Sequence, residues 1–180
     1  MDMGVATAIA AIIAAIASVV SVVIGARNAQ HSEMRSAYRQ ALTPYLAPMS
    51  RELNQVTACA VIVRRRYLLG QAVAAWVANG TASAKRLEVL RRDTRYLLPR
   101  LITPLRTAVL LIYRITTYKD LPDTNAEDLL VAGQKLSDAL NHAIEVSYRK
   151  GKPVSKYRGY RLRTQAEAID ALWAARPARP

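Results

Sequence analysis

The fold prediction starts from residues Met3–Ala26, which read MGVATAIAAIIAAIASVVSVVIGA and contain no charged side chain. Of these 24 residues, 19 are apolar and the others are glycine, serine or threonine. A helix needs about 20 residues to cross the hydrocarbon core of a bilayer, which is about 30 Å thick. The stretch therefore predicts a transmembrane helix, and residues 1–26 are assigned as an N-terminal membrane anchor.

Two other interpretations of this stretch stay open. A cleaved secretory signal would begin with basic residues and have an apolar core of about 7 to 15 residues. This chain instead begins with Met1, Asp2 and Met3, and its apolar run is longer. A buried helix of a soluble bundle seldom runs this far without a charge. An uncleaved anchor is favoured over both.

The charges that flank the stretch predict its orientation. Only Asp2 and the terminal amine precede it, whereas Arg27, Arg35 and Arg39 follow it. Basic residues near the end of a span stay on the cytoplasmic side. We therefore expect a single-pass protein of the inner or plasma membrane, with its N-terminus outside and its C-terminal domain in the cytoplasm.

Small residues recur along one side of the predicted anchor. They follow one another at steps of three and four and are Thr7, Ala10, Ala14, Ser18, Ser21 and Gly25. Such stripes let helix backbones approach closely in lipid. The stripe favours packing against a second copy or a membrane partner, although an alanine-rich chain also produces such a pattern by composition alone.

The rest of the chain predicts an all-α fold, with a basic antiparallel bundle of about four helices at residues 27–175. Helices are expected at 27–42, 50–79, 84–118, 124–150 and about 164–175. Residues 176–180 contain two prolines and predict a disordered tail.

Glycine and proline residues predict where these helices begin and end. Pro44 and Pro48 predict a turn, because proline disfavours helix at its own position and before it. Gly80 is expected to end the second helix, and Gly151 the fourth. The third helix is expected to split near its two prolines, Pro99 and Pro104.

Side chains suited to catalysis or metal binding are few. Asp138, His142 and Glu145 fall on one side of one predicted helix, but no second cluster accompanies them, so a solvated polar face explains them better. Cys59, the single cysteine, lies in an apolar setting without a histidine partner. No phosphate-binding glycine motif occurs. The sequence therefore predicts no enzyme, no catalytic residue, no metal and no cofactor.

Basic residues give the strongest functional indication, because 26 Lys and Arg outnumber 13 Asp and Glu. They are densest between Tyr148 and Arg163, a segment that is expected to be a loop with Tyr148, Tyr157 and Tyr160 interleaved. Its cationic residues are Arg149, Lys150, Lys152, Lys156, Arg158, Arg161 and Arg163. Such a segment is suited to anionic lipid headgroups or, less well, to nucleic acid. A solvated basic loop is the plain alternative.

Together these features predict a membrane-anchored interaction protein. Its basic helical domain would associate with a membrane partner or with its own copies at the inner leaflet. One alternative is a membrane-disrupting effector that oligomerises through its transmembrane helix. A second is a membrane-tethered nucleic-acid binder.

Overall fold

The computed structural model describes the backbone of residues 3–117 and 123–175 and the side chains of residues 18–116 and 125–175. These residues form helices and no strand, which confirms the all-α fold. The elements are α1 (Met3–Leu68), α2 (Ala74–Asp93), the short 3-10 helix η1 (Pro99–Leu101), α3 (Ile102–Thr117), α4 (Asp123–Lys150) and α5 (Lys156–Ala174). They divide into two compact units, Met1–Ala37 and Tyr38–Pro180.

The first unit is the N-terminal part of α1. Its apolar side chains Val19, Val20, Val22, Val23 and Ile24 are 49–68% exposed. Among the described residues, no helix combines the length and the apolar character that crossing a membrane requires. Most of the predicted anchor falls on residues 1–17, whose side chains lie outside the described part. The structure thus does not support the predicted transmembrane helix.

The prolines of α1 lie inside the helix, so the predicted turn at Pro44 and Pro48 is wrong. An internal proline removes a backbone hydrogen bond and costs about 3 kcal/mol or more. Leu42, Met49 and Leu53, which lie before and after the prolines, are almost completely buried. Each buried side chain of this size contributes about 1.5–3 kcal/mol, and this burial offsets the lost hydrogen bonds.

The second correction concerns the end of α1, which the sequence placed at Gly80. The helix stops instead at Leu68, followed by Gly70 in the left-handed conformation with φ of 65°. The Gly70 amide donates to the Tyr67 carbonyl (3.0 Å), and the Gln71 amide donates to the Arg66 carbonyl (2.9 Å). This pair of bonds is a Schellman motif, which satisfies carbonyls at a helix end.

Gly80 lies within α2, as do residues 81–83, where the sequence predicts a turn. A Cβ built on Gly80 would come within 2.8 Å of the Cys59 Cβ and of two side-chain carbons of Ile112. The glycine therefore allows α2 to approach both α1 and α3 closely. Its role is packing, and the helix continues through it.

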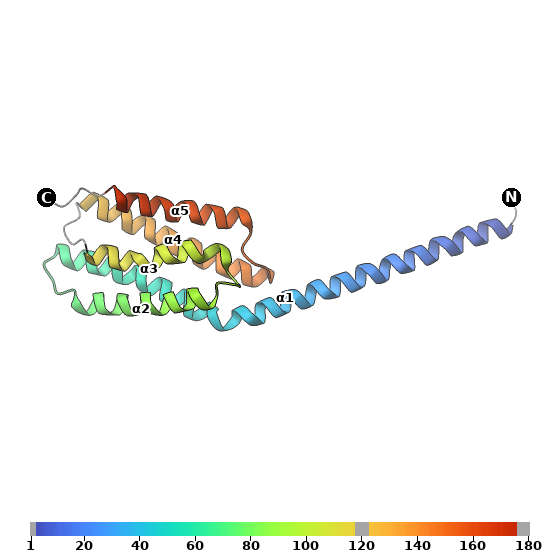
Figure 1. Ribbon diagram of the computed structural model, residues 1–180, viewed down its shortest axis with the longest axis horizontal. Helices are drawn as coiled ribbons and strands as arrows, with labels where there is room; N and C mark the ends of the chain where they lie inside the picture. The colour runs from blue at the N-terminus through green and yellow to red at the C-terminus, as the bar shows by residue number, and fades with distance from the viewer. Residues whose placement is uncertain (1–2, 118–122, 176–180) are drawn as a thin grey trace. The chain divides into compact units, whose positions relative to one another are not determined.

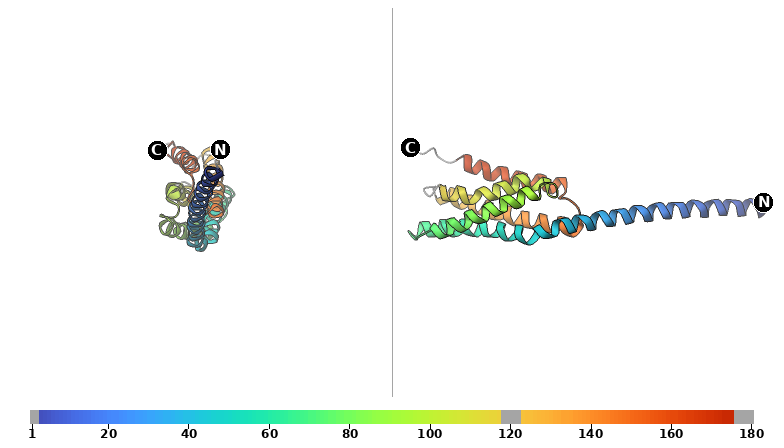
Figure 2. Two further views of the ribbon diagram at one scale, coloured as in Figure 1. Left: turned by 90° about the vertical axis from the view of Figure 1, so that its right-hand side faces the viewer. Right: turned by 60° about the horizontal axis from the view of Figure 1, so that its bottom comes forward.

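The second unit is a bundle of α2, α3, α4, α5 and the C-terminal part of α1, in which successive helices run in opposite directions (Figures 1 and 2). Helix α3 contacts α2, α4 and α5, and α4 contacts α5. An amide hydrogen bond of 2.8 Å from Asn141 to Asn54 joins α4 to α1. One core of buried side chains runs through these helices and includes Leu53, Leu87, Leu105, Ile112, Leu136, Leu140, Leu162 and Ile169.

The remaining helix ends agree with the sequence in part. The expected interruption of the third helix is present, but it lies at residues 94–98, before Pro99, and Pro104 stays inside α3. The end of α4 before Gly151 is also confirmed. The last helix begins at Lys156, well before the predicted start near residue 164, so the segment Tyr148–Arg163 is mostly helical. The predicted loop at 119–123 lies largely outside the described residues, as does the predicted tail at 176–180.

Candidate anionic-ligand site

The basic segment is organised around the connection between α4 and α5. Gly151 adopts a φ of 60° and closes α4 with a second Schellman motif, in which the Lys152 amide donates to the Ser147 carbonyl (3.1 Å). Ser155 then caps α5, because its hydroxyl accepts a hydrogen bond from the Arg158 amide (3.3 Å). The two caps bring the end of α4 and the start of α5 together across a short connection.

Helix η1 holds this connection in place. The Arg100 guanidinium donates to the Val154 carbonyl. A Cβ built on Gly159 would lie 2.8 Å from the Cβ of Arg100. Gly159, which the sequence placed in a loop, therefore gives η1 room against α5. This close approach explains why a glycine lies inside α5, at a position where the sequence predicts a loop.

The seven predicted cationic residues fall into two groups. Arg149 pairs with Glu145 at 3.5 Å, and Arg163 pairs with Glu167 at 3.8 Å. The other five form no ion pair with any residue that the structure describes, and are Lys150, Lys152, Lys156, Arg158 and Arg161. We call these five residues the basic surface. Arg158 is half-buried and the other four are exposed.

Two exposed tyrosines lie beside the basic surface. Tyr157 is 72% exposed and Tyr160 is 62% exposed. The Arg161 and Arg163 guanidinium carbons each lie 6.0 Å from a ring centroid, of Tyr157 and Tyr160 respectively. Tyr148, the third predicted aromatic residue, instead packs against the core. The outer side of α5 thus presents aromatic rings next to cationic groups.

A cavity of about 340 Å³ opens between α4 and α5 at this surface. Its walls carry His142 from α4 and Arg158, Arg161 and Gln165 from α5, and no lining residue is acidic. Residues 158, 161 and 165 recur at steps of three and four, so they share one face of α5. The cavity brings together two residues of the predicted cationic set and one histidine that the sequence did not associate with them.

The polar cluster that the sequence singled out on α4 is dispersed. Asp138 lines a separate cavity of about 400 Å³, His142 lines the cavity beside α5, and Glu145 pairs with Arg149. Among the described residues, no group of three or more histidine, cysteine or acidic side chains is placed to hold a metal ion. Cys59 is completely buried, and this burial raises the pKa of its thiol.

The N-terminal predictions fall partly outside the described side chains. In the small-residue stripe, the side chains of Thr7, Ala10 and Ala14 lie outside the described part. Those of Ser18 and Ser21 are exposed, as is Gly25. A Cβ built on Gly25 meets no atom within 4 Å. The predicted topology determinants, Arg27, Arg35 and Arg39, are all exposed.

An ion pair between the buried carboxylate of Glu52 and the exposed Arg86, which the sequence did not predict, joins α1 to α2. Glu52 accepts from Arg51 at 3.1 Å and pairs with Arg86 at 2.9 Å. Burial raises the pKa of Glu52, but hydrogen bonds from Arg86, Ser83 and Arg51 outweigh it, so the pKa lies below its usual value. The sequence contained one indication, because Glu52 falls four residues before the apolar Val56 and therefore shares its helix face.

The cavity beside Asp138 has a different character. Asn54, Thr57 and Ser137 line it together with apolar side chains. The hydroxyl of Ser137 is buried and has no hydrogen-bond partner among the described residues. Apart from Asp138 these groups are neutral, so their charge selects no class of ligand.

Comparison of the chain with family models, with curated proteins and with solved structures gives no match. The function is therefore proposed from the residues and contacts described above.

Proposed function

We propose that the protein acts by non-covalent association with an anionic membrane surface through the basic surface at the start of α5. The observation that carries this proposal is the set of five cationic side chains without acidic partners in the described part of the chain. Each Lys or Arg close to an anionic bilayer contributes about 1 kcal/mol to its attraction. No covalent chemistry is required for this role.

The exposed tyrosines support a lipid surface as the partner. Tyr157 and Tyr160 combine an apolar ring with a polar hydroxyl, the pairing that favours tyrosine at the boundary between lipid and water. Arginines beside them can place their apolar stems along the rings and their charged groups at headgroups. Bases could also stack on these rings, so nucleic acid is the competing partner in the tests below.

The N-terminal helix supports a membrane over nucleic acid. Its valines and Ile24 are exposed, and the residues from Met3 up to them carry no charged side chain. We propose that Met3–Ala26 inserts into the bilayer with the N-terminus outside and the bundle at the inner leaflet. Self-association would use the small-residue stripe, since close helix packing in lipid depends on small side chains.

Lysine footprinting tests the basic surface. The full chain is placed in nanodiscs of phosphatidylcholine alone or mixed with phosphatidylglycerol, and amine acetylation is followed by mass spectrometry. We expect Lys150, Lys152 and Lys156 to be protected only in anionic nanodiscs, and less so at high salt. Lys135, exposed on α4, is the internal control. Equal modification in both bilayers, or protection by an oligonucleotide alone, contradicts the proposal.

Cysteine labelling tests the insertion. Thr164 is exposed on α5, and a Thr164→Cys variant in intact cells should react with an impermeant maleimide only after permeabilisation. An Asp2→Cys variant is the matched control and should react without it. The reverse pattern contradicts the orientation. Dye leakage that disappears in an Ala14→Leu, Ser18→Leu variant would instead indicate a membrane-disrupting effector.

A further inference from the structure

The cavity between α4 and α5 adds a concave site to the basic surface. We propose that it binds a phosphate monoester, either as a lipid headgroup or as a free molecule. This inference rests on the proposed function, because Arg158 and Arg161 belong to the basic surface and also line the cavity. It adds a chemical selection that attraction to an anionic surface alone does not have.

The geometry of the two helices places complementary groups around one space. Arg158 and Arg161 come from one face of α5, and His142 faces them from α4. Ala139 and Leu162 also line the cavity and give it an apolar part. Cationic and polar groups on the walls with an apolar part beside them suit a phosphate group attached to a short carbon skeleton.

The charges around the cavity favour an anion. Neither Arg158 nor Arg161 has an acidic partner among the described residues, and no acidic side chain lines the cavity. A guanidinium binds two oxygens of one phosphate through parallel hydrogen bonds. Two such groups can therefore share the three free oxygens of a monoester.

The first turn of α5 adds to this preference. Ser155 and Tyr157 border the cavity at the N-terminal end of the helix. Backbone amides at a helix N-terminus carry a partial positive charge that favours anions. A phosphate diester has two free oxygens and one negative charge, and so makes fewer of these interactions. The cavity should prefer the monoester to the diester.

Calorimetric titration of the full chain in non-ionic detergent tests the selection. Glycerol 3-phosphate is the free monoester, and glycerophosphoglycerol is the anionic diester. We expect the monoester to bind more tightly, and an Arg158→Gln, Arg161→Gln variant to lose about tenfold or more in affinity. The matched control is Arg149→Gln, Arg163→Gln, which removes the same charge from arginines outside the cavity and should retain the preference.

A second variant guards against misfolding. His142→Gln keeps both arginines and changes one exposed wall residue, so it should weaken monoester binding while its thermal unfolding matches that of the wild type. An unchanged affinity in both cavity variants overturns the inference. Equal losses in the cavity variant and in the Arg149, Arg163 control overturn it too, because general charge attraction then explains the binding.

Nanodiscs distinguish the two sources of the monoester. Phosphatidic acid and phosphatidylglycerol are compared at equal surface charge, with protection of Lys156 as the readout. Stronger protection by phosphatidic acid, lost in the Arg158, Arg161 variant, assigns the ligand to a lipid. Binding of glycerol 3-phosphate with no lysine protection in any bilayer supports a free monoester and removes the membrane proposal. Protection by both lipids equally, without monoester binding, overturns the inference and leaves the membrane proposal standing.

Discussion

The hydroxyl oxygen of Tyr38 lies 2.8 Å from the hydroxyl oxygen of Ser147 and connects α1 to α4. Tyr38 also donates to the Leu97 carbonyl (3.0 Å), and Ser147 donates to the Lys152 carbonyl in the connection before α5. The two hydroxyls have only two protons for these three contacts, so Tyr38 and Ser147 can donate to each other only in place of one of the two bonds to carbonyls. The network links α1 to the connection between α4 and α5, which carries part of the basic surface. Its loss should therefore lower the stability of the bundle and loosen this connection.

We expect Tyr38→Phe to lower the free energy of unfolding by about 1–2 kcal/mol, because the Leu97 carbonyl loses its side-chain donor. Ser147→Ala should act in the same direction, and the double variant should cost less than the sum because the two hydroxyls share a contact. Urea unfolding followed by circular dichroism measures all three. Tyr160→Phe, at an exposed ring, is the control and should change little; strictly additive losses would contradict the coupling.

The Tyr38 network also predicts a dependence on alkaline pH. Burial raises the pKa of Tyr38 above its ordinary value of 10.0, against an opposing effect of the Ser147 hydrogen bond. The folded state therefore holds the phenol proton more tightly than the unfolded chain. This contribution is complete below pH 10 and is lost as the pH rises through the raised pKa. We therefore expect the difference in free energy of unfolding between the wild type and Tyr38→Phe to become smaller as the pH rises from 9 to 11. Urea unfolding at several pH values measures it.

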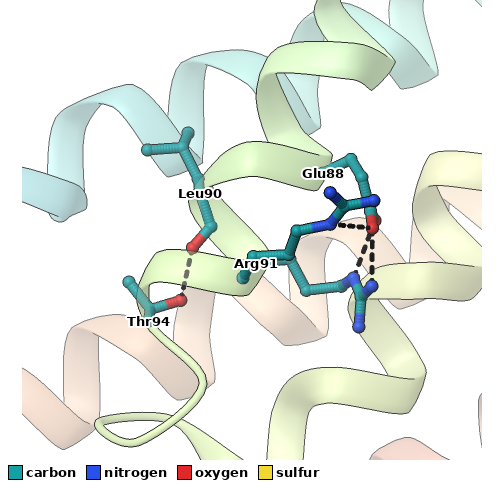
Figure 3. A network of polar contacts seen from close by, with 5 residues as sticks. Glu88, Leu90, Arg91 and Thr94 are labelled. Carbon is teal, nitrogen blue, oxygen red and sulfur yellow. Dashed lines mark hydrogen bonds and ion pairs between the residues drawn. The ribbon is translucent and has the colours of Figure 1, made fainter.

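A carboxylate near the end of α2 predicts the acid dependence of stability. Arg91 donates to the two oxygens of Glu88 at 2.6 and 2.7 Å (Figure 3). Arg92 donates to one of the same oxygens at 3.0 Å. The hydrogen bonds from Arg91, with a smaller effect of Arg92, lower the pKa of Glu88 to about 2 against burial. Thr94 completes this helix end by donating to the Leu90 carbonyl at 2.7 Å.

Glu88→Gln should destabilise the bundle by about 1 kcal/mol at pH 7, since it removes the charge from a partly exposed ion pair. A depressed carboxyl pKa stabilises the fold above the ordinary pKa of 4.5 and stops doing so as the pH falls toward about 2. The difference between wild type and variant should therefore shrink over that window. Glu167→Gln, whose partner lies 3.8 Å away, is the control; a constant difference across the window contradicts the assignment.

Replacing different glycines of the bundle with alanine should lower the free energy of unfolding by different amounts. Gly80→Ala would press its Cβ against the Cys59 Cβ, which is attached to the backbone and cannot rotate away. At Gly133 the nearest atoms belong to the end of the Leu111 side chain, which can turn. Overpacking costs about 1–3 kcal/mol and exceeds the helix gain of about 1 kcal/mol from alanine. Thermal unfolding should therefore show a larger loss for Gly80→Ala than for Gly133→Ala.

In the turn after α1, replacing Gly70 should lower the free energy of unfolding through its backbone conformation alone. A Cβ on Gly70 meets no atom within 4 Å, yet its φ of 65° is unfavourable for alanine. Gly70→Ala should cost about 1–2 kcal/mol, and Gly70→Asn less, because asparagine tolerates the left-handed region. Chemical denaturation compares the two variants. Equal losses would point to a packing role that the contacts do not show.

The amphipathic helices could be predicted from the sequence because their spacing is a local property. Helix α4 ends where Gly151 predicts it, and Leu136, Leu140 and Ile144 are buried as their spacing requires. The class of fold follows from several such helices. No alternating pattern competed with them, so the all-α prediction did not depend on distant contacts.

The errors arose where distant contacts decide the outcome. Pro44 and Pro48 remain helical because the surrounding face is buried against other helices, which local propensity does not reveal. Gly80 and Gly159 resemble helix breakers in the sequence, yet each provides room for a neighbouring segment. Gly70, by contrast, ends a helix through its own backbone angle, and nothing local distinguishes it from the other glycines.

The composition of the sequence predicted which segment carries the candidate site, but not how its residues are arranged in space. The density of Lys and Arg between residues 149 and 163 indicated the segment, but not which of them pair with acids. Arg149 and Arg163 each form an ion pair with a glutamate four residues away on the same helix, Glu145 and Glu167, and are therefore not part of the basic surface. The cavity residue His142 belongs to another helix, and only the packing of α4 on α5 brings it to the arginines.

Because Cys59 is buried and is the single cysteine of the chain, the rate at which its thiol is modified can measure how often the bundle opens. The side chain has no exposed surface, and its raised pKa keeps it protonated at neutral pH. A thiol reagent can therefore reach it only when α1 and α2 separate, and the rate of modification at excess reagent reports that separation. Cysteines introduced at exposed positions react on a different timescale, so they can carry spectroscopic labels without removing the native residue.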